Sequence, residues 1–208
     1  QIDNWLPFYW AGFQQTTRYT YILQELGNMQ RLWDGLKANI RGDIKKASDR
    51  FNVRIRSDVT VEDFLALNRM TFLRQNMAMP YTETFVNKLD QACSARKSRK
   101  IFIAEDDKGR AHAGVYIVWD SNSAYYLMGG GDPALRNSGA TSYCIWEAIK
   151  FAATVTQRFD FEGSMIEPVE RFFSAFGAQQ TPYFSVSKTN SHILKMVFLL
   201  RSLRGEAQ

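Results

Sequence analysis

The feature that most constrains the fold is a change in the spacing of hydrophobic residues near residue 100. Before it, apolar side chains recur every three or four residues, which predicts helices. These stripes begin after Asn28 and after Asp58 or Thr60, which are plausible helix caps, and near Thr82. After residue 100 apolar and polar residues alternate, which predicts strands over 100–105, 111–120 and 124–128 joined by short turns.

The remaining segments predict helices and strands in alternation. A helix is predicted over 141–152, and another over 168–176 that ends at Gly177. Strands are expected at 19–23, 53–56, 158–161 and 183–187, with a last helix over 191–204. The order β-α-α-β-β-β-α-β-α-β predicts an α/β fold, with an α+β mixed sheet that carries helices on both faces.

Composition indicates a globular domain. The 208 residues are 45% hydrophobic and 23% charged, enough to build one core and too apolar for a disordered chain. No apolar run is long enough to span a bilayer, and no secretory signal is visible. The cysteines Cys93 and Cys144 are expected to be buried free thiols in a reducing cytosol, so the predicted location is cytoplasmic. With His112 and His192 they show no metal-ligand spacing, and no metal is expected.

The chain begins at Gln1, which predicts a processed chain or the C-terminal part of a longer protein. Residues 1–27, rich in aromatic side chains, are expected to be a connecting arm from a missing N-terminal half. Residues 28–190 are expected to form the main domain, and residues 191–208 a basic C-terminal helix and tail.

Basic residues cluster in this chain of net charge +5. Lys37, Arg41 and Lys45 recur every four residues and so share one helix face. Such a cluster is either a solvated surface or a site for an anionic partner, such as a phosphorylated cofactor, a nucleotide-linked substrate or RNA.

An arginine and several small residues precede the helix predicted over 141–152. The first turn of a helix has unpaired N–H groups and partial positive charge, so small residues there would let a phosphate approach. A capped turn, with Ser138 as the cap, explains the same pattern. The candidate anion-binding residues are Arg136, Asn137, Ser138, Gly139, Ala140 and Thr141.

These residues resemble a known loop. Arg136-x-x-Gly139-x-Thr141, after three strands and before a long helix, is similar to the coenzyme A pyrophosphate loop of GNAT N-acyltransferases, although Thr141 replaces the usual Gly or Ala. The segment FDFEGSMIEPVERFFSAFG over 159–177 resembles the signature of the FemAB-like branch, without its usual Tyr-Lys pair. The resemblance covers nearly the whole chain and implies the second GNAT half plus the connecting segment.

The resemblance implies an N-acyltransferase that moves an acyl group, with acetyl as the first expectation, from coenzyme A to an amine. It places the donor where the strands near Leu127–Gly130 and 159–162 separate, so Met128 and Gly129 join the candidate donor-binding residues. Asp160 and Glu162 alternate with phenylalanines and are expected on one face of a strand, as candidates for amine binding or proton removal. Asp160 could instead cap a loop or pair with an arginine.

Other roles are assigned to single residues. Tyr183 and Tyr126 are candidates to protonate the leaving thiolate, whereas His112 is expected to be a surface or core residue. The segment RGDIKKA over 41–47 resembles an Arg-x-x-Ile-x-x-Ala segment of Fem-type proteins, whose basic face could bind an anionic acceptor. The candidate substrate-binding residues are Arg18, Tyr19, Arg41, Lys45 and Trp119.

Two alternatives remain open. The first is a Fem-type aminoacyltransferase that takes its donor from aminoacyl-tRNA and acts on a cell-wall peptide precursor. Such an enzyme would not need a tight pyrophosphate pocket. The second is a non-catalytic GNAT-like binding domain. The expected partners are an amine or peptide substrate, aminoacyl-tRNA in the first alternative, and a second copy of the chain.

Overall fold

The computed structural model describes residue 2 and residues 4–203, and the chain folds into two compact units. One unit is Thr20–Gln180, and the other combines Gln1–Tyr19 with Thr181–Gln208. The helices are α1 (Leu6–Trp10), α2 (Met29–Gly35), α3 (Ala38–Phe51), α4 (Val61–Arg74), α5 (Glu83–Ala95), the 3₁₀ turn η1 (Arg136–Ser138), α6 (Ala140–Ala152), α7 (Glu167–Ser174) and α8 (His192–Leu203). The strands are β1 (Gln14–Leu23), β2 (Arg54–Arg56), β3 (Arg99–Glu105), β4 (Ala111–Trp119), β5 (Ser123–Gly131), β6 (Arg158–Asp160) and β7 (Gln179–Ser187).

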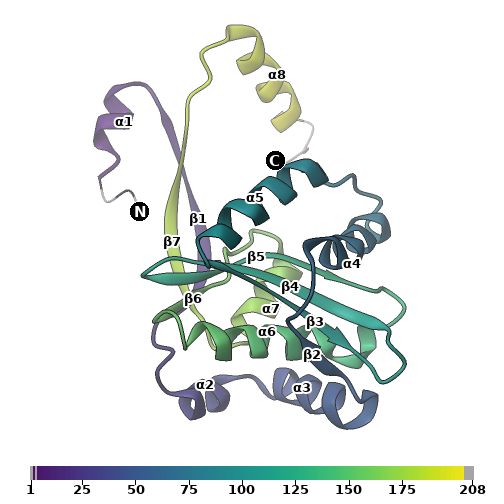
Figure 1. The fold of residues 1–208 in the computed structure, drawn as a ribbon. Coiled ribbons are helices and arrows are strands. Elements are labelled where there is room, and N and C mark those ends of the chain that lie inside the picture. The colour runs from purple at the N-terminus through teal and green to yellow at the C-terminus, as the bar shows by residue number, and fades with distance from the viewer. Residues whose placement is uncertain (1, 3, 204–208) are drawn as a thin grey trace. The chain divides into compact units, whose positions relative to one another are not determined.

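The predicted order of elements is confirmed from β2 to β7, and the sheet is mixed. Its strands lie in the order β2-β3-β4-β5-β6-β1-β7 (Figure 1). The neighbours from β2 to β5 are antiparallel, whereas β5 and β6 are parallel. The strands β1 and β7 each cross the division between the two units. The predicted boundaries at residues 27 and 190 therefore differ from the limits of the compact unit.

Three helix starts form as the local sequence predicts. The side chain of Asn28 accepts a hydrogen bond from the Arg31 N–H over 2.9 Å. Thr60 begins α4 with a capping box, in which Thr60 and Asp63 each bond the other's backbone N–H. Thr82 caps α5 through a single bond, which its side chain accepts from the N–H of Phe85 over 3.2 Å.

The single apolar stripe from Met29 to Ala47 is divided between two helices. Leu36 is extended, with ψ of 138°, and separates α2 from α3. The break has a tertiary cause, because the Lys37 N–H donates to the carbonyl of Ala175 over 2.9 Å. This bond to a distant part of the chain replaces a helical one, which periodicity cannot reveal.

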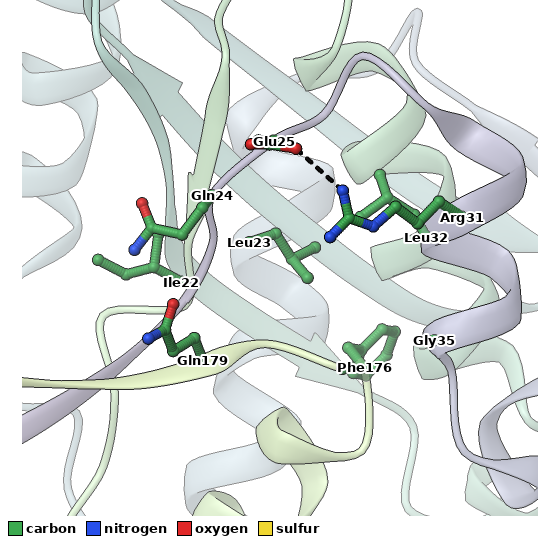
Figure 2. A pocket seen from close by; sticks show the side chains of 10 residues that line it. Ile22, Leu23, Gln24, Glu25, Arg31, Leu32, Gly35, Phe176 and Gln179 are labelled. Carbon is green, nitrogen blue, oxygen red and sulfur yellow. Dashed lines mark hydrogen bonds and ion pairs between the residues drawn. The ribbon is translucent and has the colours of Figure 1, made fainter.

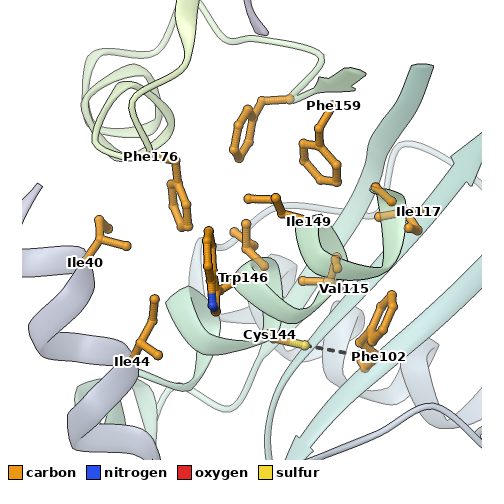
Figure 3. Close-up of a cluster of buried hydrophobic side chains, with 14 of the residues drawn as sticks. Ile40, Ile44, Phe102, Val115, Ile117, Cys144, Trp146, Ile149, Phe159 and Phe176 are labelled. Carbon is orange, nitrogen blue, oxygen red and sulfur yellow. Dashed lines mark hydrogen bonds between the residues drawn. The ribbon is translucent and has the colours of Figure 1, made fainter. Parts of the chain in front are cut away.

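Two hydrophobic clusters cover the two faces of the sheet. Strand alternation directs Phe102 to one face and Ile101 and Ile103 to the other. The larger cluster packs α3, α6 and α7 on the sheet, and Figure 3 shows Ile40, Trp146 and Ile149 meeting there. The smaller cluster packs α4 and α5 on the opposite face. Cys144 is buried in the larger cluster as expected, whereas Cys93 is only half-buried.

Candidate active site

The parallel strands β5 and β6 pair over only three residues and then separate. Their last paired residues are Tyr125 and Asp160, after which β5 continues alone to Gly131. An irregularity in the pairing of β5 with β4 leaves Leu127 without a partner residue, because Tyr116 pairs with Met128 and Ile117 with Tyr126. The two strands therefore separate between the segments 127–130 and 159–162, which is where the sequence analysis expected the separation.

The side of β5 that has lost β6 is covered by side chains of α4. Asn68 is 2% exposed, and its amide Nδ2 donates to the Gly129 carbonyl over 2.7 Å. The hydroxyl of Thr71 accepts from the Gly131 N–H over 3.1 Å. These bonds satisfy strand groups that β6 does not reach. Asn68 and Thr71 were not among the predicted site residues, because neither lies in a recognisable motif.

The three glycines at the end of β5 allow this close approach. A Cβ on Gly130 would lie 2.5 Å from the backbone N of Asn68, and one on Gly129 would lie 1.8 Å from the hydroxyl oxygen of Tyr126. The glycines therefore continue the strand rather than break it, which corrects the predicted strand end at residue 128. Met128 is partly buried against the smaller cluster.

Two tyrosines lie near this point. The hydroxyl of Tyr81 donates to Asn68 Oδ1 over 2.8 Å, which completes a chain from Tyr81 through Asn68 to Gly129. The ring of Tyr126 packs edge-on against Phe173. Burial, with smaller contributions from Cys144 and Tyr81, raises the pKa of Tyr126, so its hydroxyl stays protonated at neutral pH.

Asp160 closes a turn at the end of β6. Its Oδ1 accepts hydrogen bonds from the Glu162 N–H over 2.8 Å and from the Thr20 hydroxyl. This is the loop-capping role that the sequence left open for Asp160. It does not exclude a second role, because the residue remains half-exposed.

Glu162 does not share the strand face that alternation predicted. The strand ends at Asp160, and Glu162 is left-handed with φ of 59°. Glu162 as a whole is exposed, yet desolvation first and the charge of Asp160 second raise the pKa of its carboxyl group. A carboxylate with a raised pKa is a stronger base than an ordinary one, so Glu162 suits proton removal from an amine.

The start of α6 is closed by α3. Gly139 has φ of 81° and occupies the N-cap position, while the Ser138 hydroxyl accepts from the Ala140 N–H, the first of the helix, over 3.3 Å. A Cβ on Gly139 would lie 2.3 Å from the carbonyl oxygen of Asp43. The Asp43 carboxylate also lies 3.4 Å from the Ser142 hydroxyl in the first turn of α6. The small residues here let two helices approach, and Asp43 places a negative charge where a phosphate was expected.

The other residues of the predicted anion loop differ in exposure. Arg136 and Asn137 are exposed, whereas Ser138 and Ala140 are each 2% exposed. Thr141 is half-buried in the first turn of α6. Phosphate binding by this loop stays a prediction, and its buried members face the packing just described.

Of the predicted substrate-binding residues in the larger unit, only Lys45 is freely exposed. Arg41 donates to the carbonyls of Asp34, over 3.1 Å, and of Leu36, and so completes the end of α2. Lys45 is exposed on α3. The ring of Trp119 packs edge-on against Phe151, with the ring centroids 5.2 Å apart.

Arg18, Tyr19 and Tyr183 belong to the smaller unit, and Tyr19 and Tyr183 are about two-fifths exposed. Their roles in binding and catalysis stay predictions. His112 is a buried residue of β4, and its Nε2 lies 3.2 Å from Oδ2 of Asp106. Among the described residues, no three His, Cys, Asp or Glu side chains are placed to hold a metal ion.

A separate pocket of about 460 Å³ lies beside the end of β1 (Figure 2). Leu23, Leu32 and Phe176 form its apolar wall, and an exposed ion pair of 3.1 Å joins Glu25 to Arg31 at its edge. This pocket holds none of the predicted site residues.

Comparisons with known proteins show the family and the fold of the chain. The model of the acetyltransferase (GNAT) domain matches residues 35–172. A search of curated protein sequences found no match. The structure of FemX is similar with a TM-score of 0.74 at 12% identity, covering 92% of this chain and 70% of that chain.

Two further structures are similar, and one of them carries the name of a lysylphosphatidylglycerol synthetase. The C-terminal domain of a putative enzyme of this name from Agrobacterium fabrum has a TM-score of 0.61 at 13% identity, covering 93% of this chain and 68% of that one. The structure of L-PGS from Bacillus licheniformis has a TM-score of 0.59 at 11% identity. The match covers 100% of this chain and 72% of that one. Likeness at such identities shows the fold.

Proposed function

Because the chain belongs to the acetyltransferase (GNAT) domain family, whose members are N-acyltransferases, we propose that it transfers an aminoacyl group from aminoacyl-tRNA to an amine. The observation that carries the choice of donor is the closed start of α6, where the Asp43 backbone covers Gly139. A coenzyme A pyrophosphate that approached Gly139 from this side would have to displace α3, and it would meet the Asp43 carboxylate, whose charge is partly offset by Lys46 at 3.1 Å.

A second observation supports the same choice. The two amide groups of a pantetheine arm could pair with a free strand edge, as an added strand does. On β5 the Gly129 carbonyl and the Gly131 N–H already bond Asn68 and Thr71. An aminoacyl ester needs neither the pyrophosphate site nor this edge. The net charge of +5 also suits a polyanionic donor.

The aminoacyl transfer requires few chemical groups from the chain. The amine attacks the ester carbonyl, a C–N bond forms, and the bond to the ribose oxygen breaks. Glu162 takes the proton that the amine loses and passes it to the departing ribose oxygen, which leaves as a hydroxyl group. Asp160 holds the turn that positions Glu162. The donor and the amine meet where β5 leaves β6, and their proximity supplies most of the rate.

The test compares two donors on the full chain. We expect a labelled amino acid to be transferred from aminoacyl-tRNA to a peptide amine, with deacylated tRNA as the binding control. In calorimetric titrations we expect no heat of binding with coenzyme A or acetyl-CoA. An Arg136→Ala change tests the loop and avoids Gly139, whose replacement would disturb the packing on Asp43. Micromolar coenzyme A binding that weakens in Arg136→Ala would overturn the proposed donor and restore acyl-CoA as the donor.

A further inference from the structure

The smaller unit carries a helix that is apolar on nearly every side. No helix among the described residues is both long and apolar enough to cross a bilayer. Yet α8 exposes a run of large apolar side chains, among them Ile193 at 76%, Met196 at 65% and Leu200 at 54%. A helix of this composition is normally buried, so a covering partner is expected.

The short helix α1 of the same unit has the same character. None of its residues is buried, and Leu6, Tyr9 and Trp10 are 46%, 59% and 74% exposed. Tyrosine and tryptophan are the side chains that favour the boundary between hydrocarbon and water, because their rings are apolar and their N–H or O–H groups are polar.

The charge around these helices has one sign. The residues of this unit whose side chains the structure describes, 2, 4–19 and 181–200, contain no aspartate or glutamate but contain Arg18, Lys188 and Lys195. A hollow of about 640 Å³ within the unit is lined by Phe198 of α8, by Lys195, and by Lys188, whose ammonium group donates to the Ala11 carbonyl over 2.6 Å. Lysine next to apolar surface can hold its ammonium group at the headgroup level while its carbon chain lies among apolar groups.

We propose that α1 and α8 form a docking surface for an anionic lipid bilayer, on which they lie without crossing it. Exposed aliphatic and aromatic side chains together with basic residues are what interfacial helices use. A second copy of the chain fits less well, because its matching surface would bring basic groups together, and the described residues of this unit offer no acid to pair them. RNA fits less well because it leaves the aliphatic side chains of α8 in water.

The test is co-sedimentation of the full chain with vesicles of phosphatidylcholine alone or of phosphatidylcholine with phosphatidylglycerol. We expect binding only to the anionic vesicles, weaker at high ionic strength. Met196→Ser with Leu200→Ser should lower the partition constant about tenfold or more, because two large apolar groups are lost. Lys195→Gln should lower it roughly fivefold.

The matched control is Leu73→Ser with Phe85→Ser, which removes two apolar side chains of similar exposure from the larger unit. This control should bind anionic vesicles like the unchanged chain, and circular dichroism should show all variants folded. Three results would overturn the proposal. The first is equal binding to neutral and anionic vesicles, and the second is no vesicle binding at all. The third is self-association or tRNA binding that the changes in α8 abolish, while vesicle binding is unaffected by the same changes.

Discussion

The amide of Asn68 donates to the carbonyl of Gly129 over 2.7 Å and so ties α4 to β5 where β5 has lost its neighbour β6. The other end of the amide accepts from Tyr81, so one buried side chain satisfies two polar groups. Removing it should therefore cost more than removing either partner.

We expect Asn68→Ala to lower the free energy of unfolding by about 1–3 kcal/mol, because the half-buried Gly129 carbonyl and the Tyr81 hydroxyl both lose their partner. Tyr81→Phe removes only one hydrogen bond and should cost about 1 kcal/mol. Urea unfolding of both variants measures the difference. Equal losses would mean that the bond to Gly129 contributes nothing measurable.

Two glycines in the same left-handed conformation should tolerate alanine differently. Gly109 has φ of 73° with open space at its Cβ position, so Gly109→Ala should cost only the backbone strain, roughly 1–2 kcal/mol. Gly139→Ala adds a clash with the backbone of Asp43 and should cost about 3 kcal/mol or more. Thermal unfolding of the Gly109→Ala and Gly139→Ala variants measures the difference. Similar melting temperatures would contradict the close packing of α3 on the start of α6.

Glu162→Gln should stabilise the fold at neutral pH. The pKa of this carboxyl is raised above its ordinary 4.5, so the folded state prefers the protonated form and loses stability as the pH rises through that range. The advantage of the glutamine variant should therefore appear above the ordinary pKa and vanish in acid. Melting temperatures measured across the pH range test this. An advantage that persists unchanged in acid would contradict the stated cause.

Replacing Glu162 and replacing Asp160 should also change the kinetics in different ways. Glu162→Gln should lower kcat by about 10²–10⁴ if Glu162 is the base. In Asp160→Asn one cause of the raised pKa is gone, so the acidic limb of the kcat/KM profile should move to lower pH. A limb that stays in place would show that Asp160 does not influence the base.

Asp106→Asn should destabilise the hairpin of β3 and β4. Burial raises the pKa of Asp106, but hydrogen bonds from Arg110, His112 and the backbone outweigh it and hold the pKa below its usual range. The resulting stability is present above the ordinary aspartate pKa of 3.8 and is lost as the pH falls below it. We expect a loss of stability at neutral pH that shrinks in acid, measured by urea unfolding. A loss independent of pH would point to packing instead.

Much of the architecture follows from the sequence because it rests on contacts between near neighbours in the chain. The caps at Asn28, Thr60 and Thr82 join residues three apart, and hydrophobic spacing reports which face of each helix or strand is buried. The element order and the resemblance to the GNAT fold depend on these local signals, and the family match agrees with them.

The site depends on contacts that the sequence does not reveal. An arginine followed by small residues before a helix suits both a bound phosphate and a second helix packed close by. Only the folded position of α3, whose Asp43 lies 99 residues before Ser142, distinguishes them. In the same way Asn68 meets Gly129 across 61 residues, and the end of β6 at Asp160 leaves Glu162 in a turn. The sequence by itself determined that α6 begins with an arginine and small residues. Only the tertiary structure decided whether this helix start is accessible to a ligand, because the space beside a backbone depends on which distant segment packs against it.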